Sequence, residues 1–162
     1  ATPYDSWATA KGLTGANNGK GDDPDNDGRN NLAEFAFDGD PLSGVNDGKV
    51  VGKVATVGGD QVLTLTLPVR NGAVFSADSG DQRTATAVDG VVYRIEGDKS
   101  LSPFADNISE VTGGDAAAIQ AGLPALSDIA APAGADWTYR TFRAPDNVAT
   151  EAKAFLRGKV SE

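Results

Sequence analysis

Residues 23–34 read DPDNDGRNNLAE, and the first part of the chain is organised around them. Counted from Asp23, acidic residues stand at loop positions 1, 3, 5 and 12, and a glycine stands at position 6. This spacing is that of a calcium loop of the EF-hand type, in which alternate short carboxylates converge on one hard cation. The sequence therefore predicts a Ca²⁺ site within residues 23–34.

The predicted Ca²⁺ ligands are oxygen atoms from acidic side chains, a backbone carbonyl and a water-bridged amide. They belong to Asp23, Asp25, Asp27, Arg29 (through its carbonyl), Asn31 (through a water molecule) and Glu34 (as a bidentate carboxylate). Without a cation the four carboxylates would repel one another. The alternative is a solvated acidic turn, but the complete pattern favours the cation. Asp38 and Asp40 leave open a second ion, although solvation of a helix end is the favoured role there.

Short helices are expected on both sides of this loop. The first is predicted over residues 3–13, with Thr2 as its N-cap and Trp7 on its apolar face. The second follows the loop and ends before Gly39. Helices this short are not stable alone in water, so a bound ion is expected to hold them together. Residues 1–43 are thus predicted to form a helix–calcium loop–helix appendage, which chelation would unfold while the remainder stays folded.

From residue 44 onward the hydrophobic periodicity changes from helical to alternating. Strands are predicted at residues 49–57, 61–67, 83–88, 91–96, 108–112, 137–143 and 153–160. The Gly-Gly pair 58–59 and the Asp-Gly pair 89–90 predict hairpin turns, residues 116–121 fit either a helix or a strand, and 130–135 fit a loop. Many short strands separated by turns predict a mainly β fold. We expect an antiparallel β-sandwich over residues 44–162, packed with residues 1–43 as one unit.

Three stretches, in this order, resemble parts of a known kind of module. They are Trp7 to Leu13 with Asp23–Ala36 and Asp40-Pro41, then Val62–Thr66 with Val92–Glu96, and finally Ala154–Val160. Together they resemble the C-terminal accessory modules of secreted bacterial multidomain proteins. Such modules pair a calcium loop, similar to those of dockerins and thrombospondin type 3 repeats, with a small β-sandwich. The resemblance implies a covalently linked upstream domain, either catalytic and active on polysaccharides or adhesin-like.

The chain departs from this kind of module in two places. A tryptophan commonly follows the Tyr-x-Val/Ile-Glu strand, but Ser102-Pro103-Phe104 stands near that place here, so the role of that tryptophan is not transferred. A dockerin has two calcium segments in tandem, and this chain has one. Docking to a cohesin is therefore not expected.

The composition excludes several functions. Because the 162 residues contain no histidine and no cysteine, Ser–His and Cys–His nucleophiles and histidine zinc sites are impossible. A carboxylate pair of the glycosidase type, or a Lys, Tyr or Arg base, remains open. Acidic residues in loops are usually only solvated, so we expect no catalysis. A net charge of −9 argues against binding to nucleic acid or to anionic membranes, and no apolar stretch is long enough to be inserted into a bilayer. The chain has no methionine and starts at Ala1, as an excised piece would. Together with the calcium loop, these features predict a secreted, extracellular or cell-surface module.

Two non-catalytic functions compete, and the first is the favoured one. The first is a carbohydrate-binding module, in which exposed aromatic rings stack on the sugars of a polysaccharide. Trp137 and Tyr139 are two residues apart on a predicted strand and share a face, so we predict that they form this stacking platform. The alternative is that both belong to the core. The second function is a structural, anchoring or sorting role in cell-surface display, without glycan binding.

Overall fold

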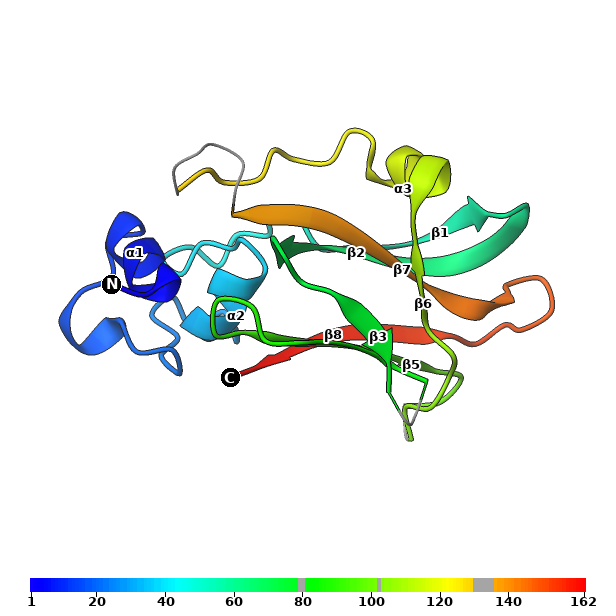
Figure 1. The fold of residues 1–162 in the computed structure, drawn as a ribbon, viewed down its shortest axis with the longest axis horizontal. Coiled ribbons are helices and arrows are strands. Elements are labelled where there is room, and N and C mark those ends of the chain that lie inside the picture. The colour runs from blue at the N-terminus through cyan, green and yellow to red at the C-terminus, as the bar shows by residue number, and fades with distance from the viewer. Residues whose placement is uncertain (79–80, 102, 130–135) are drawn as a thin grey trace.

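The computed structural model describes residues 1–78, 81–101, 103–129 and 136–162. In these residues two antiparallel sheets of four strands each pack face to face (Figure 1). The predicted class, a mainly β chain with antiparallel sheets, is confirmed. The predicted loop at 130–135 lies outside the described residues.

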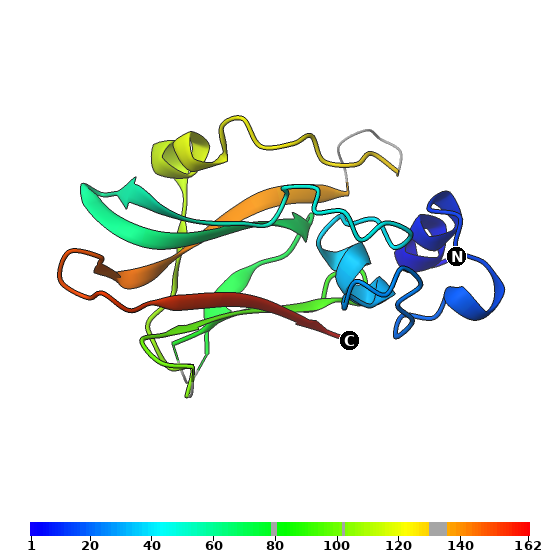
Figure 2. The ribbon, with the colours of Figure 1, turned by 180° about the vertical axis from the view of Figure 1, so that it is seen from behind.

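Each sheet combines strands that are distant in the sequence. In spatial order the first sheet contains β1 (Val51–Val57), β2 (Asp60–Arg70), β7 (Trp137–Asn147) and β6 (Ser109–Val111). The second sheet contains β3 (Phe75–Ala77), β4 (Arg83–Ala85), β5 (Val92–Asp98) and β8 (Phe155–Ser161). Seen from behind, β8 lies at the front and its C-terminal end points towards α2 (Asn31–Ala36) (Figure 2).

Both predicted hairpin turns are present. Gly58 and Gly59 have φ angles of 59° and 91°, and Val57 pairs with Asp60 across them. The second turn places Asp89 at φ 53° and Gly90 at φ 79°, between the bridged residues 88 and 91. Positive φ at both central positions matches the twist of the flanking strands, which is why these residue pairs identified the turns. β4 is shorter than predicted, and β3 was not predicted at all.

The helices are α1 (Pro3–Ala10), the 3-10 helix η1 (Gly15–Asn17), α2 and α3 (Gly113–Gln120). Thr2 caps α1, since its hydroxyl oxygen accepts a 3.1 Å hydrogen bond from the Asp5 N–H. The helix ends at Ala10, three residues earlier than predicted, because Gly12 takes a φ of 80°. Within the described residues, no helix has the length and the apolar character that crossing a membrane requires.

The segment that the sequence left undecided, 116–121, lies mostly in α3. This helix buries Ala116 and Ile119 in a small cluster with Val111 of β6. The Lys53 ammonium in β1 donates to the Ile119 carbonyl at 3.0 Å, which ties α3 to the first sheet. A run of alanines favours helix once such a surface is available to bury one face.

Four aromatic rings connect α1 and α2 to the sandwich. The ring centroids of Tyr4, Trp7 and Phe35 lie 5.5 Å from one another, and Trp137 of β7 lies 6.4 Å from Phe35. All four side chains are buried in the hydrophobic core that also contains residues of both sheets. The first two helices therefore contribute to the core of the sandwich.

Candidate metal centre

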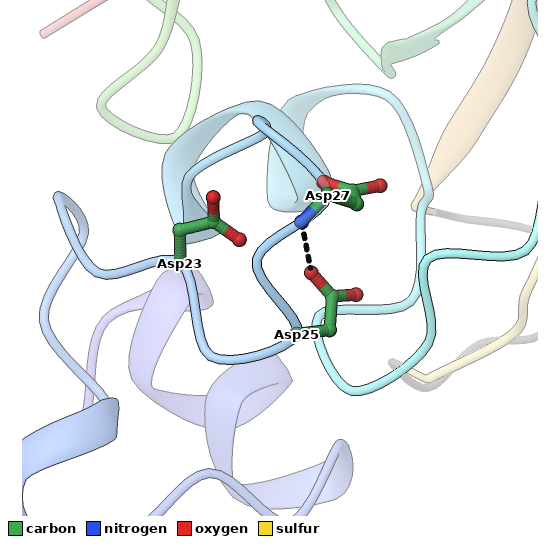
Figure 3. A group of neighbouring side chains, drawn as sticks. All are labelled: Asp23, Asp25 and Asp27. Atoms are coloured by element: carbon green, nitrogen blue, oxygen red, sulfur yellow. Dashed lines mark hydrogen bonds between the residues drawn. The ribbon is translucent and has the colours of Figure 1, made fainter.

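Three aspartates converge in the loop before α2. Asp23, Asp25 and Asp27 each place one carboxylate oxygen within 4.8 Å of the others, and they form the group of potential metal ligands found among the described residues (Figure 3). Asn26 at φ 60° and Gly28 at φ 95° reverse the chain between and after them. The sequence placed these three residues together correctly, because short side chains at alternate positions of a tight turn point to its inside.

Backbone hydrogen bonds fix the orientation of these carboxylates. Gly28 N donates to Asp23 Oδ2 at 3.0 Å, Asp27 N donates to Asp25 Oδ1 at 3.2 Å, and Arg29 N donates to Asp27 Oδ1 at 2.8 Å. Each bond uses one carboxylate oxygen. Among the described residues, Asp23 Oδ1 and Asp25 Oδ2 are buried and accept no hydrogen bond. A buried carboxylate oxygen without a donor is costly, so the loop has the chemistry of a cation site.

Glu34 lies one turn into α2 with its side chain 3% exposed. It is outside the three-aspartate group, and its Oε1 atom lies 3.8 Å from Nη1 of Arg29. Burial raises the pKa of Glu34 to about 7, against the opposing effect of the Arg29 guanidinium and with added repulsion from Asp27 and Asp25. Burial also raises the pKa of Asp25, and the charges of Asp27 and Asp23 add to it, although the Asp27 N–H opposes the shift. A divalent cation would favour the charged form of these groups.

Asn31 has a structural role that the sequence did not predict. Its side chain is buried, and its Nδ2 atom donates to the carbonyls of Asn17 and Gly19 at 2.9 and 2.8 Å. Its own N–H donates to the Asp22 carbonyl at 2.7 Å. Asn31 therefore fastens the segment that enters the loop to the start of α2, and its amide nitrogen is occupied in doing so.

The sequence missed two further residues that shape the site. Asn30 caps α2, because its Oδ1 accepts a 3.0 Å hydrogen bond from Ala33 N. Gly39 lies against the Glu34 carboxylate, since a Cβ atom at Gly39 would fall 1.5 Å from Glu34 Oε2. From the sequence, Gly39 was expected only to end the helix. No local pattern indicates that the Glu34 side chain packs against it.

A lysine ammonium occupies the place suggested for a second ion near Asp38 and Asp40. The Lys49 ammonium lies 2.8 Å from Asp38 Oδ2, which also accepts a 2.7 Å hydrogen bond from Ser127 N. Asp38 Oδ1 is buried without a partner in the described part of the chain, but the adjacent ammonium would repel a second ion. Asp40 is exposed and accepts from Leu42 N at 3.2 Å. These two aspartates therefore do not form a site together.

The suggested sugar platform is not exposed. The Trp137 side chain is 4% exposed, and its indole Nε1 donates to the Phe35 carbonyl at 2.9 Å. Tyr139 is half-buried, and its hydroxyl donates to the Pro124 carbonyl at 2.8 Å. The structure thus places Trp137 in the core, which was the alternative, and we withdraw it as an exposed stacking surface.

Comparisons of the chain with protein-family models, with curated proteins and with solved structures found no match.

Proposed function

We propose that residues 23–34 bind one Ca²⁺ ion and that the chain is a non-catalytic, calcium-stabilised accessory module of a secreted protein. The observation that carries this proposal is the pair of buried oxygens, Asp23 Oδ1 and Asp25 Oδ2, which have no partner in the described structure. They belong to the group in which three aspartates converge. A bound cation would supply the partner that each oxygen lacks.

Ca²⁺ suits this loop because it takes six to eight oxygen ligands in flexible geometry. Asp23, Asp25 and Asp27 would supply three carboxylates and Arg29 its backbone carbonyl. Glu34 would be the fourth carboxylate. It is buried beside the loop and its pKa is raised, and a bound cation would stabilise its charged form. A water molecule near Asn31 would complete the coordination. The loop, α1 and α2 would together form the helix–calcium loop–helix unit.

The expected role of the ion is to stabilise and not to switch. α1 has 8 residues and α2 has 6, which is too short for either helix to be stable alone. The Phe35 and Ala36 carbonyls of α2 accept hydrogen bonds from Trp137 of β7 and Tyr93 of β5. By fixing α2, the ion would stabilise the contacts of both sheets with this helix. Ligand binding to the native state alone raises the free energy of unfolding.

Calorimetric titration with CaCl₂ tests the proposal. The unaltered protein is expected to bind one ion, and Glu34→Gln is expected to weaken binding strongly because an anionic ligand is lost. Glu151→Gln is the matched control, since Glu151 lies between β7 and β8 and accepts from Lys153 N. Equal affinity in both variants would reject Glu34 as a ligand, and no heat of binding in the unaltered protein would reject the site.

The accessory role has two forms, and both remain proposals. Support for a structural, anchoring or display role comes from the burial of Trp137, which removes the predicted glycan platform. Support for glycan binding comes from a separate pocket, which Trp137 lines. The absence of histidine and cysteine from the sequence supports a non-catalytic module in either case. Retention on polysaccharide affinity gels separates the two forms, and the sequence of the parent protein would identify the linked domain.

A further inference from the structure

A pocket of about 560 Å³ lies where α1 meets the ends of the two sheets. Its walls include Trp7 of α1, Arg70 at the end of β2, and Trp137 at the start of β7. Asp89, from the turn before β5, and Asp136 complete its polar side. The volume is within the range of small-ligand sites. None of these residues belongs to the proposed Ca²⁺ loop.

Arg70 is held rigidly in this pocket. It is 6% exposed, and its guanidinium carbon lies 4.5 Å from the Trp137 ring centroid and 4.7 Å from that of Phe35. Its Nε and Nη2 atoms each lie 2.9 Å from Asp89 Oδ2, and Nη1 lies 3.5 Å from Asp136 Oδ1. A buried guanidinium that contacts two rings and two carboxylates has a preorganised arrangement of donors.

Trp7 adds a hydrogen-bond donor that the described protein does not use. Its side chain is 1% exposed, and its indole Nε1 donates to no acceptor within residues 1–78, 81–101, 103–129 and 136–162. A buried N–H without an acceptor costs free energy, and most buried indole N–H groups are paired. An acceptor brought by a bound molecule or by water would remove this cost.

The charges of the pocket select against ions. One arginine and two aspartates, Arg70, Asp89 and Asp136, sum to −1, and the whole chain carries −9, so an anion is disfavoured. A cation would meet the buried guanidinium. Asp136 Oδ2 is already occupied by the Ile129 N–H at 2.7 Å, whereas the Asp89 side chain is 30% exposed and accessible. The pocket therefore suits a neutral molecule that both donates and accepts hydrogen bonds.

We propose that this pocket binds a neutral saccharide ring. Sugar hydroxyls can accept from the Arg70 and Trp7 donors and donate to Asp89, and the C–H face of the ring can pack against indole edges. Trp137 then serves as a wall of the pocket and not as an exposed platform. The inference rests on the proposed accessory role and gives it a ligand class, but it does not depend on Ca²⁺.

Intrinsic fluorescence tests this directly, because the chain has two tryptophans and both line the pocket. The probes are neutral hexasaccharides of β-1,4-linked glucose, β-1,4-linked xylose, β-1,4-linked mannose and α-1,4-linked glucose, with trigalacturonate as the anionic comparison. At least one neutral probe is expected to change the emission in a saturable way. Asp89→Asn removes an anionic acceptor and should weaken that binding about tenfold. Asparagine tolerates the left-handed backbone of residue 89, so the turn is preserved.

Two further variants make the result specific. Asp81→Asn is the matched control, because Asp81 also has a positive φ but lies between β3 and β4. Ser6→Phe places a larger side chain at an exposed position of α1 that lines the pocket, and it should block the probe. Thermal unfolding confirms that each variant is folded, and calorimetry with CaCl₂ should give unchanged Ca²⁺ affinity in all three. No response to any neutral probe at about 10 mM would overturn the proposal. So would tighter binding of trigalacturonate, or equal affinity of the unaltered protein and Asp89→Asn. None of these results would affect the Ca²⁺ site.

Discussion

The hydroxyl group of Tyr93 in β5 donates a 2.7 Å hydrogen bond to the carbonyl of Ala36, the last residue of α2. The same oxygen accepts from the Arg70 N–H of β2 at 2.9 Å. One buried phenol thus joins the helix that follows the acidic loop to both sheets of the sandwich. The position of α2, which follows the loop, is therefore coupled to the packing of both sheets.

Tyr93→Phe should therefore destabilise the protein by about 1–3 kcal/mol, because it leaves a carbonyl and an N–H buried without partners. Urea unfolding measures the change. Tyr139→Phe is the matched control: it removes a hydroxyl whose partner, the Pro124 carbonyl, is near the surface. Its cost should be smaller, about 0.5–1.5 kcal/mol. An equal loss of unfolding free energy in both variants would show that the two hydrogen bonds of the Tyr93 hydroxyl stabilise the fold no more than the one from Tyr139.

Removal of Ca²⁺ should lower the stability of the whole domain in one transition. The sequence alone led us to expect that residues 1–43 would unfold separately, but Trp7 and Phe35 share a core with Trp137. At a Ca²⁺ concentration of about 100 times the dissociation constant, the loss on chelation is about 2.7 kcal/mol. Thermal unfolding with and without EGTA, followed by far-ultraviolet and near-ultraviolet circular dichroism, tests this. Two separated transitions in EGTA would support the independent appendage instead.

Local patterns predicted the elements whose geometry is determined locally. The turns at 58–59 and 89–90 require positive φ, and glycine or Asp-Gly provides it. The three-residue strand β3 was missed because its pairing with β4, which makes Phe75–Ala77 a strand, is not visible in the local sequence. The pairing of β2 with β7, which joins Arg70 to Trp137, spans a long stretch of chain that no local pattern describes.

The same limit explains the site predictions. Alternating aspartates placed three carboxylates correctly because a single turn carries them all. Alternation along β7 showed that Trp137 and Tyr139 share a face, but it could not show whether that face is covered. The α2 helix covers the Trp137 end of this face, through the contact between Phe35 and Trp137. The segment that follows α3 covers the Tyr139 end, where the Tyr139 hydroxyl donates to the Pro124 carbonyl. Arg70 gave no signal in the sequence, because its contacts with the Phe35 and Trp137 rings exist only after α2 and β7 meet.

Acid should weaken the second sheet through Glu96. Burial alone would raise the pKa of this carboxyl, but hydrogen bonds from Arg157 and Arg94, and the charges of Arg157 and Lys159, lower it below its ordinary value of 4.5. Because the folded pKa is the lower one, Glu96 contributes stability above pH 4.5, and this contribution is lost as the pH falls through the folded value. Glu96→Gln should flatten the dependence of unfolding free energy on pH in this acidic range. Asp60→Asn, at the exposed first residue of β2, is the control, and an unchanged slope in Glu96→Gln would contradict the assignment.

Gly39→Ala should reduce Ca²⁺ affinity without unfolding the protein. The new Cβ atom would lie 1.5 Å from Glu34 Oε2, so the carboxylate must leave its present position, which the flexible end of a glutamate can do. A change at a residue that lies against a metal ligand, as Gly39 lies against Glu34, typically costs about 10- to 100-fold in metal affinity. Gly21→Ala is the control, because a Cβ atom at Gly21 meets nothing within 4 Å and Gly21 precedes the same loop. Calorimetry with CaCl₂ compares the two. If both alanine variants bound Ca²⁺ as the unaltered protein does, the position of Glu34 against Gly39 would be irrelevant to the ion, and Glu34 would not be its ligand.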